Sequence, residues 1–197
     1  MERRDFIGLG LSSLILPRAV LSATDDRPMS RAARRGLLPN IPLVAHTGET
    51  VHFYDDLIRD RTVLFNFFIV GCTDGSCPTA TANLRRVQDL LGERMGRDVF
   101  FYSITLQPEQ DTPAILREYA EGFDIRPGWL FLTGKPADID LLRRRQGYYD
   151  PNPERDRDPN NHAAMGRYGN DRLERWGAIA LRSSPDNIAS TFKWLTD

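Results

Sequence analysis

The feature that most constrains the fold is a nearly continuous apolar stretch at residues 62–70, TVLFNFFIV. A run of this kind, rich in β-branched and aromatic residues, is typical of a strand that is buried on both faces. Such strands lie inside α/β sheets that helices cover on both sides. Gly71 follows the stretch directly, and a helical pattern begins near Pro78. The sequence therefore predicts a strand, a turn and a helix at the centre of an α/β domain.

The other apolar patterns continue this alternation of strands and helices. In chain order we expect a hairpin at 43–54, a strand at 62–70, a helix at 80–95, a strand at 98–105, a helix at 114–121, a strand at 129–132, a helix at 136–145, strands at 162–168 and 173–181, and a helix from 185 onward. The order predicts an α/β, thioredoxin-like fold in which helices flank a central mixed sheet. An added N-terminal hairpin and a long loop at 148–161, before the last hairpin, extend it.

Length and composition indicate one globular domain behind a targeting segment. Of the 197 residues, 41% are hydrophobic and 27% are charged, as in ordinary folded domains. We assign residues 1–23 to an export signal, 24–39 to an Arg-rich linker and 40–197 to the thioredoxin-like domain. The formal net charge of −1 provides no basic field for a nucleic-acid backbone, so no nucleic-acid partner is expected.

The N-terminus has the pattern of a twin-arginine export signal. Arg3 and Arg4 precede an apolar run at residues 7–16, which is shorter than the about 20 residues that a transmembrane helix needs. The pattern predicts export to the periplasm. Cleavage after Ala23 would release the protein, whereas an uncleaved signal would tether it to a membrane. A short amphipathic or disordered N-terminus is the alternative interpretation.

The two cysteines, Cys72 and Cys77, lie in the turn between the central strand and the following helix. A helix N-terminus stabilises a thiolate, so we expect a lowered pKa for Cys77. A thiolate is the form that binds a metal or attacks a disulfide. A structural disulfide or two buried thiols would be the simpler explanation, but a pair at a loop tip is poorly placed to cross-link the fold.

Four segments together resemble one family. The stretch FNFFIVGCTDGSCPTATANL resembles the metal-binding turn of the Sco/SenC/PrrC copper chaperones, in which a strand leads into Cys, three residues, Cys and Pro. The segment SITLQPEQDTPAILREYAEGF at 103–123 is similar to the family's SVDPERDTP-type segment, and GWLFLTG at 128–134 to its next strand. His162 begins a segment similar to the region of the ligand histidine. The resemblance covers residues 40–197.

The resemblance implies that Cys72, Cys77 and His162 hold one copper ion, as Cu(I), Cu(II) or both. Two thiolates and an imidazole are soft donors that suit copper, whereas structural zinc would take a fourth ligand. Considered by itself, a lone histidine after a loop is more often a surface residue. Met165 would be an additional soft donor, or simply a packed or exposed side chain.

The sequence also departs from the family pattern. Four residues, 73–76, separate the cysteines where the family has three. We expect Gly75 to absorb the extra residue as a bulge, because glycine adopts positive φ at little steric cost. Gln107 and Asn161 stand where aspartate is common in relatives, which lowers the negative charge around the expected site.

Two functions follow from these residues. The first is a periplasmic chaperone that delivers copper to a cuproenzyme such as the binuclear copper site of cytochrome c oxidase. The second is an enzyme, a thiol-disulfide oxidoreductase in which Cys72 and Cys77 form the catalytic redox pair and reduce the cysteines of the copper acceptor. Such an enzyme would itself need a redox partner, but it would not need His162.

Replacing Arg3 and Arg4 together by Lys tests the export signal. Lysine keeps the positive charge but lacks the planar guanidinium, and receptors do not treat the two as equivalent. We expect the double variant to remain in the cytoplasm, as measured by cell fractionation and immunoblotting. Unchanged accumulation in the periplasm would refute the assignment.

Overall fold

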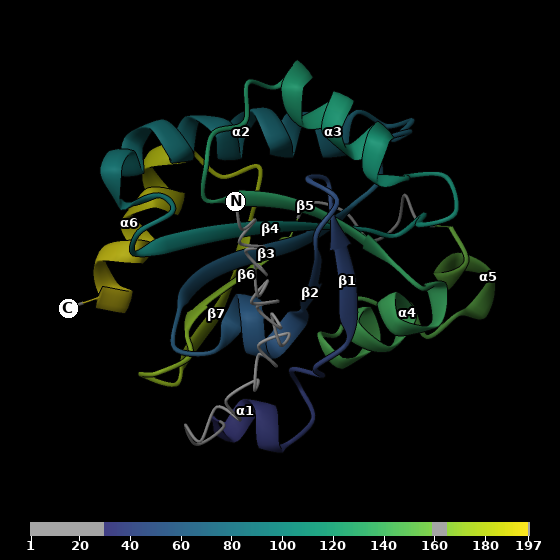
Figure 1. Cartoon of the computed structure of the whole chain (residues 1–197), viewed down its shortest axis with the longest axis horizontal. Coiled ribbons are helices and arrows are strands. Elements are labelled where there is room, and N and C mark those ends of the chain that lie inside the picture. Colours follow the sequence, from purple (N-terminus) through teal and green to yellow (C-terminus); the bar gives the residue numbers. More distant parts are fainter. Residues whose placement is uncertain (1–29, 159–164, 197) are drawn as a thin grey trace, which may run out of the picture.

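A computed structural model describes residues 30–158 and 165–196. Its centre is one seven-stranded sheet with the strand order β2-β1-β5-β4-β3-β6-β7, covered by helices on both faces (Figure 1). The strands are β1 (Pro42–Ala45), β2 (Thr50–His52), β3 (Thr62–Phe68), β4 (Val99–Thr105), β5 (Trp129–Gly134), β6 (Met165–Asn170) and β7 (Arg175–Ala180). The helices are α1 (Arg31–Arg34), η1 (Phe53–Ile58), α2 (Ser76–Leu91), η2 (Gly92–Arg94), α3 (Pro113–Gly122), α4 (Pro136–Arg145), α5 (Pro153–Asp156) and α6 (Pro185–Thr196). None of the helices described has the length and apolar character to cross a membrane.

The sheet is mixed, as predicted, and β3 lies inside it. β3 pairs with β4 in parallel and with β6 in antiparallel orientation, and β4 pairs with β5 in parallel. All seven residues of β3 are buried, which confirms the prediction from the apolar run. Because the three parallel strands point the same way, their C-terminal ends meet at one edge of the sheet. The turns that follow β3 and β4 therefore lie side by side.

Successive residues of β3 supply the two cores. Leu64 and Phe68 face the layer formed by α2, α3 and α6, whereas Val63, Phe65 and Phe67 face the layer formed by α1, η1 and α4. This division follows from the two-residue period of a strand, which sends neighbouring side chains to opposite faces. The double burial also explains why the run is apolar without alternation.

Several predicted boundaries shift in the structure. The helix expected at residue 80 begins at Ser76, so that Pro78 lies inside its first turn rather than at its first position. The strand expected to continue to Tyr54 ends at His52. From Phe53 the chain forms η1, whose Phe53 and Tyr54 side chains are fully buried. Burial in the second core thus overrides the β-propensity of these aromatic residues.

The linker prediction for residues 24–39 is wrong for its described part. Ser30 caps α1, and Ala33 and Leu38 are buried in the second core. The backbone N–H of Ser30 donates to the Tyr54 hydroxyl at 2.9 Å, and that hydroxyl donates to Asp171 at 3.1 Å. The few apolar residues of this Arg-rich stretch show no period, so only tertiary packing reveals that it joins the domain.

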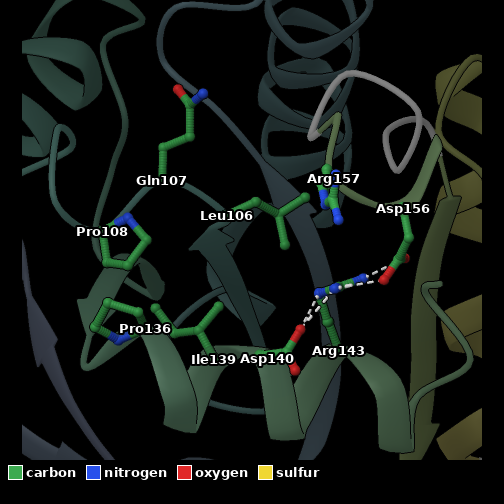
Figure 2. Close-up of a pocket in the computed structure, with 9 residues that line it drawn as sticks. All are labelled: Leu106, Gln107, Pro108, Pro136, Ile139, Asp140, Arg143, Asp156 and Arg157. Atoms are coloured by element: carbon green, nitrogen blue, oxygen red, sulfur yellow. Dashed lines mark hydrogen bonds and ion pairs between the residues drawn. The ribbon is translucent and has the colours of Figure 1, made fainter. Parts of the chain in front are cut away.

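The segment expected to be a loop without structure is anchored over its described part, residues 148–158. It contains the short helix α5, whose Asp156 side chain is only 6% exposed. Arg143 of α4 donates two hydrogen bonds to the Asp156 carboxylate, at 2.8 and 2.9 Å (Figure 2). Arg144 donates a third at 2.6 Å, and these guanidinium groups, Arg143 above all, hold the pKa of Asp156 well below its usual range.

Replacing Asp156 by Asn should show that this ion pair holds the segment. Breaking a buried pair from one side leaves an uncompensated charge, so we expect a loss of about 3 kcal/mol in the free energy of unfolding. The loss should diminish as the pH falls below about 4, where the carboxyl group of the unfolded chain becomes protonated. Urea denaturation measures both effects.

The control lies in the same helix. Glu154 pairs with Arg157 at 2.9 Å, but both side chains are about three-quarters exposed, at 76% and 74%. Replacing Glu154 by Gln should therefore cost less than about 1 kcal/mol. Equal costs for the two variants would show that the Asp156 pair does not anchor the segment.

Candidate metal centre at the cysteine turn

The turn that carries the cysteines is anchored to the neighbouring strand before it reaches α2. The buried Asp111 carboxylate accepts a hydrogen bond from the Val70 backbone N–H at 3.2 Å and another from the Thr105 hydroxyl. The backbone N–H of Leu106 donates to the Phe68 carbonyl at 2.9 Å. Asp111 thus joins the ends of β3 and β4. The side chain that caps the next helix, α3, is that of Thr112.

The two cysteines meet at the N-terminus of α2, as predicted, and neither is in a disulfide. The backbone N–H of Cys77 donates to the sulfur of Cys72 at 3.3 Å. Cys72 is half-buried, whereas Cys77 is only 2% exposed and packs within the first core. The turn therefore holds one accessible and one enclosed sulfur.

Asp74 is the residue of the site that sequence reasoning missed. Its Oδ1 accepts a hydrogen bond from the Cys72 thiol at 2.9 Å and another from the Ser76 backbone N–H at 2.9 Å. These bonds, the one from Cys72 above all, lower the pKa of Asp74 to about 2. Its position in the sequence could have identified Asp74, because an aspartate two residues before a helix start commonly accepts a hydrogen bond from the backbone in this way.

The expected lowering of the Cys77 pKa is wrong in this conformation. Burial above all, together with the neighbouring Cys72, raises the pKa of the Cys77 thiol to about 12. The helix N-terminus favours the thiolate, but removal from water disfavours any charged form more strongly. Cys77 is therefore a neutral thiol here, and a metal ion or a change of conformation would have to displace its proton.

A tyrosine and a threonine lie close behind the cysteine pair, and no pattern in the sequence pointed to them. The Thr81 hydroxyl donates to the Cys77 carbonyl at 3.0 Å and lies 3.0 Å from the Tyr119 hydroxyl. Burial raises the pKa of Tyr119 to about 12, and the two cysteines contribute to the shift. Thr81 lies one turn after Cys77 in α2, whereas Tyr119 comes from α3 on the same face of the sheet, so only the fold brings Tyr119 to the site.

Gly75 adopts the positive φ that was predicted for it. It is the N-cap of α2, with φ +73° and ψ 3°, in the left-handed region. A Cβ atom built on it would have no neighbour within 4 Å, so the constraint on this position is conformational and not steric.

Of the three histidines, His46 and His52 lie in the N-terminal hairpin region of the sheet, and His162, the predicted third ligand, lies outside the described residues. His46 accepts a hydrogen bond on Nδ1 from the Phe131 N–H at 3.2 Å, and burial lowers its pKa. His52 lies in β2, with three strands between it and β3, and its Nδ1 is 3.5 Å from Asp56. Met165, the other soft donor considered, is 40% exposed.

No third donor from the described chain completes a metal site. Residues 30–158 and 165–196 contain no group of three or more His, Cys, Asp or Glu side chains that could hold a metal ion. Two sulfurs at one turn nevertheless suit a soft ion such as copper, provided that a further ligand reaches them.

The fold and this turn together define a class: a thioredoxin-like protein with a cysteine pair at the N-terminus of the helix that follows its central strand. Comparison with known proteins makes the class specific. The chain belongs to the SCO1/SenC family, whose family model matches residues 37–192.

Three similar proteins illustrate the match. A SCO2-like protein of Rickettsia prowazekii is 31% identical over 97 residues, which are 49% of this chain and 44% of that protein. The chain spans about half the length of the curated relatives that it matches first. The copper-bound ScoI of Bradyrhizobium japonicum is 26% identical with a TM-score of 0.61, over 78% of this chain and 96% of that one. BsSco, in which a disulfide switch was identified, is described as a member of the Sco family of cytochrome c oxidase assembly proteins. It shares the fold with a TM-score of 0.63 and 22% identity, over 79% of this chain and 90% of that one.

Replacing Gly75 by Ala tests the role of the left-handed N-cap. Alanine in this conformation costs about 1 kcal/mol or more, so the free energy of unfolding of the variant should fall by about that amount. Urea denaturation of the protein with both cysteines reduced measures the loss. Gly71→Ala is the matched control, because Gly71 lies in the same turn, has no neighbour within 4 Å and does not adopt positive φ. A loss of equal size in both variants would show that the conformation of Gly75 is not the constraint.

Proposed function

We propose that this protein is a copper chaperone that holds one copper ion between Cys72, Cys77 and His162. The observation that carries the proposal is the 3.3 Å contact between the Cys77 N–H and the Cys72 sulfur, which puts both sulfurs in one turn. Soft sulfur donors favour Cu(I), and an imidazole allows the site to hold Cu(II) as well. The copper-bound structure of a relative supports the choice of metal.

Chain connectivity supports His162 as the third ligand. β6 runs antiparallel to β3, so Met165 begins β6 at the end of the sheet where β3 leads into the cysteine turn. Two residues, 163 and 164, lie between His162 and Met165, and an extended chain spans at most about 3.6 Å per residue. Three residue steps therefore limit the distance between the Cα atoms of His162 and Met165 to about 11 Å, which supports His162 as a ligand near the cysteine turn.

We further propose that the protein works in the periplasm and passes copper by ligand exchange to a cuproenzyme. The twin-arginine pattern supports export. The description of BsSco as a cytochrome c oxidase assembly protein supports the binuclear copper site of that oxidase as the acceptor. The half-buried Cys72 suits such a transfer, because an incoming ligand could bind the ion and displace the accessible Cys72 sulfur while Cys77 still holds the ion.

A thiol-disulfide oxidoreductase remains the second candidate, since the same two sulfurs could exchange with a disulfide. In that reaction Cys72 and Cys77 would be oxidised to a disulfide while the acceptor's disulfide is reduced to two thiols. The accessible Cys72 would attack first, and Cys77 would resolve the mixed disulfide. The raised pKa of Cys77 counts against it as the attacking group.

Copper titration of the reduced full-length chain tests the proposal. Loss of an outer-shell partner of a metal ligand typically costs about 10–100-fold in affinity, so loss of a ligand itself should cost at least that much. We expect Cys72→Ser, Cys77→Ser and His162→Ala each to weaken Cu(I) binding by about 100-fold or more. A competing Cu(I) chelator of known affinity gives the constants.

His52→Ala is the matched control, because His52 is about half exposed and lies near the far edge of the sheet. It should bind copper like the parent protein. Unchanged affinity in either cysteine variant would exclude the site. Unchanged affinity in His162→Ala, together with efficient reduction of a protein disulfide by the parent, would favour the oxidoreductase.

A further inference from the structure

The end of the sheet opposite the cysteines carries a pocket lined with arginines. It has a volume of about 630 Å³ and lies at the N-terminal ends of β3 and β4, between the 94–98 segment and the turn that joins β6 to β7. Its lining is Asp60, Arg61, Thr62, Arg94, Arg97, Asp98, Phe100, Asn170, Arg172 and Leu173. β3 is seven residues long, so the pocket and the cysteine turn are about 20 Å apart along the strand.

The charge of this lining is positive and comes from guanidinium groups alone. Four arginines face two aspartates, which gives a formal net charge of +2 (four minus two). Arg97 donates to the Asp98 carboxylate at 3.1 and 2.9 Å, but both side chains are exposed, at 64% and 41%, so this pair is weak and easily rearranged. The pocket therefore attracts an anion.

The surroundings also orient the arginines. The guanidinium of Arg61 lies 4.7 Å from the centroid of the Phe100 ring, which fixes its plane. Arg94 donates to the carbonyl of Phe192 in α6 at 3.3 Å. Planar guanidinium groups bind phosphate through paired hydrogen bonds, which a lysine cannot do. A phosphate group is the anion that fits best.

The path of the chain indicates where such a phosphate would come from. The first described residues pack at this same end, where the Arg31 side chain pairs with Glu174 in the β6–β7 turn. A tether at the N-terminal side of residue 30 would hold this end, and not the cysteine end, near a bilayer and so raise the local concentration of lipid headgroups. Leu173, 40% exposed at the rim of the pocket, adds an apolar contact for such a surface.

We propose that this pocket binds the phosphate of an anionic membrane lipid and thereby holds the domain with its cysteine turn facing away from the bilayer. The inference does not depend on copper binding. It assigns the two ends of the sheet to two tasks: the arginine end contacts the membrane, and the cysteine end is presented to soluble domains of an acceptor.

Vesicle binding by the full-length chain tests the proposal. The affinity for vesicles of phosphatidylcholine with phosphatidylglycerol is divided by the affinity for vesicles of phosphatidylcholine alone. Insertion of the N-terminal residues contributes equally to both affinities, so it cancels in this ratio. Each Arg near an anionic surface contributes about 1 kcal/mol, so Arg97→Gln with Arg172→Gln should lower this ratio about 30-fold. Hydrogen exchange at residues 94–98 and 171–174 should slow only with phosphatidylglycerol.

The matched control removes the same charge elsewhere. Arg86→Gln with Arg182→Gln changes two exposed arginines outside the pocket and should leave the ratio almost unchanged. An equal loss in both double variants, or no slowing of exchange at the pocket, would overturn the proposal. Slower exchange with inorganic phosphate alone, but not with phosphatidylglycerol vesicles, would overturn the assignment to a lipid.

Discussion

The structure depends on the burial of β3 on both faces. Every residue from Thr62 to Phe68 is shielded from water, and its alternating side chains serve two separate cores. Burying one Phe or Leu side chain contributes about 1.5–3 kcal/mol, so a single strand anchors both helical layers. The position and direction of β3 then determine where the chain leaves the sheet. That exit is the cysteine turn, which is therefore held by the most strongly buried part of the molecule.

At that exit two opposed electrostatic effects act on neighbouring sulfurs. Cys77 lies at a helix N-terminus, which favours a thiolate, yet it is enclosed by apolar side chains, which favour the neutral thiol. Enclosure is the stronger effect and raises the pKa of Cys77 to about 12. Cys72 is more accessible, and its thiol donates a hydrogen bond to the Asp74 carboxylate. The pair is thus asymmetric, with an outer sulfur that can exchange partners and an inner one that remains shielded.

The same sheet separates two kinds of chemistry. Sulfur donors lie at the C-terminal end of β3, and guanidinium groups lie at its N-terminal end. The antiparallel strand β6 connects the two ends, since it begins beside the cysteine turn and finishes at the arginine pocket. The ion pair between Arg143 and Asp156 anchors α5 to α4, within the described part of the segment that precedes β6.

The sequence by itself determined the α/β class, the buried central strand, the turn with both cysteines and the need for positive φ at Gly75, because periodicity and glycine geometry are local properties. It also pointed, through resemblance, to the SCO1/SenC family, which the family comparison shows. Only the tertiary structure decided the raised pKa of Cys77, the part of Asp111 in joining β3 to β4, and the burial of Ala33, Leu38 and Asp156. Each of these depends on atoms far apart in the chain, and desolvation and long-range hydrogen bonds leave no periodic trace in a sequence.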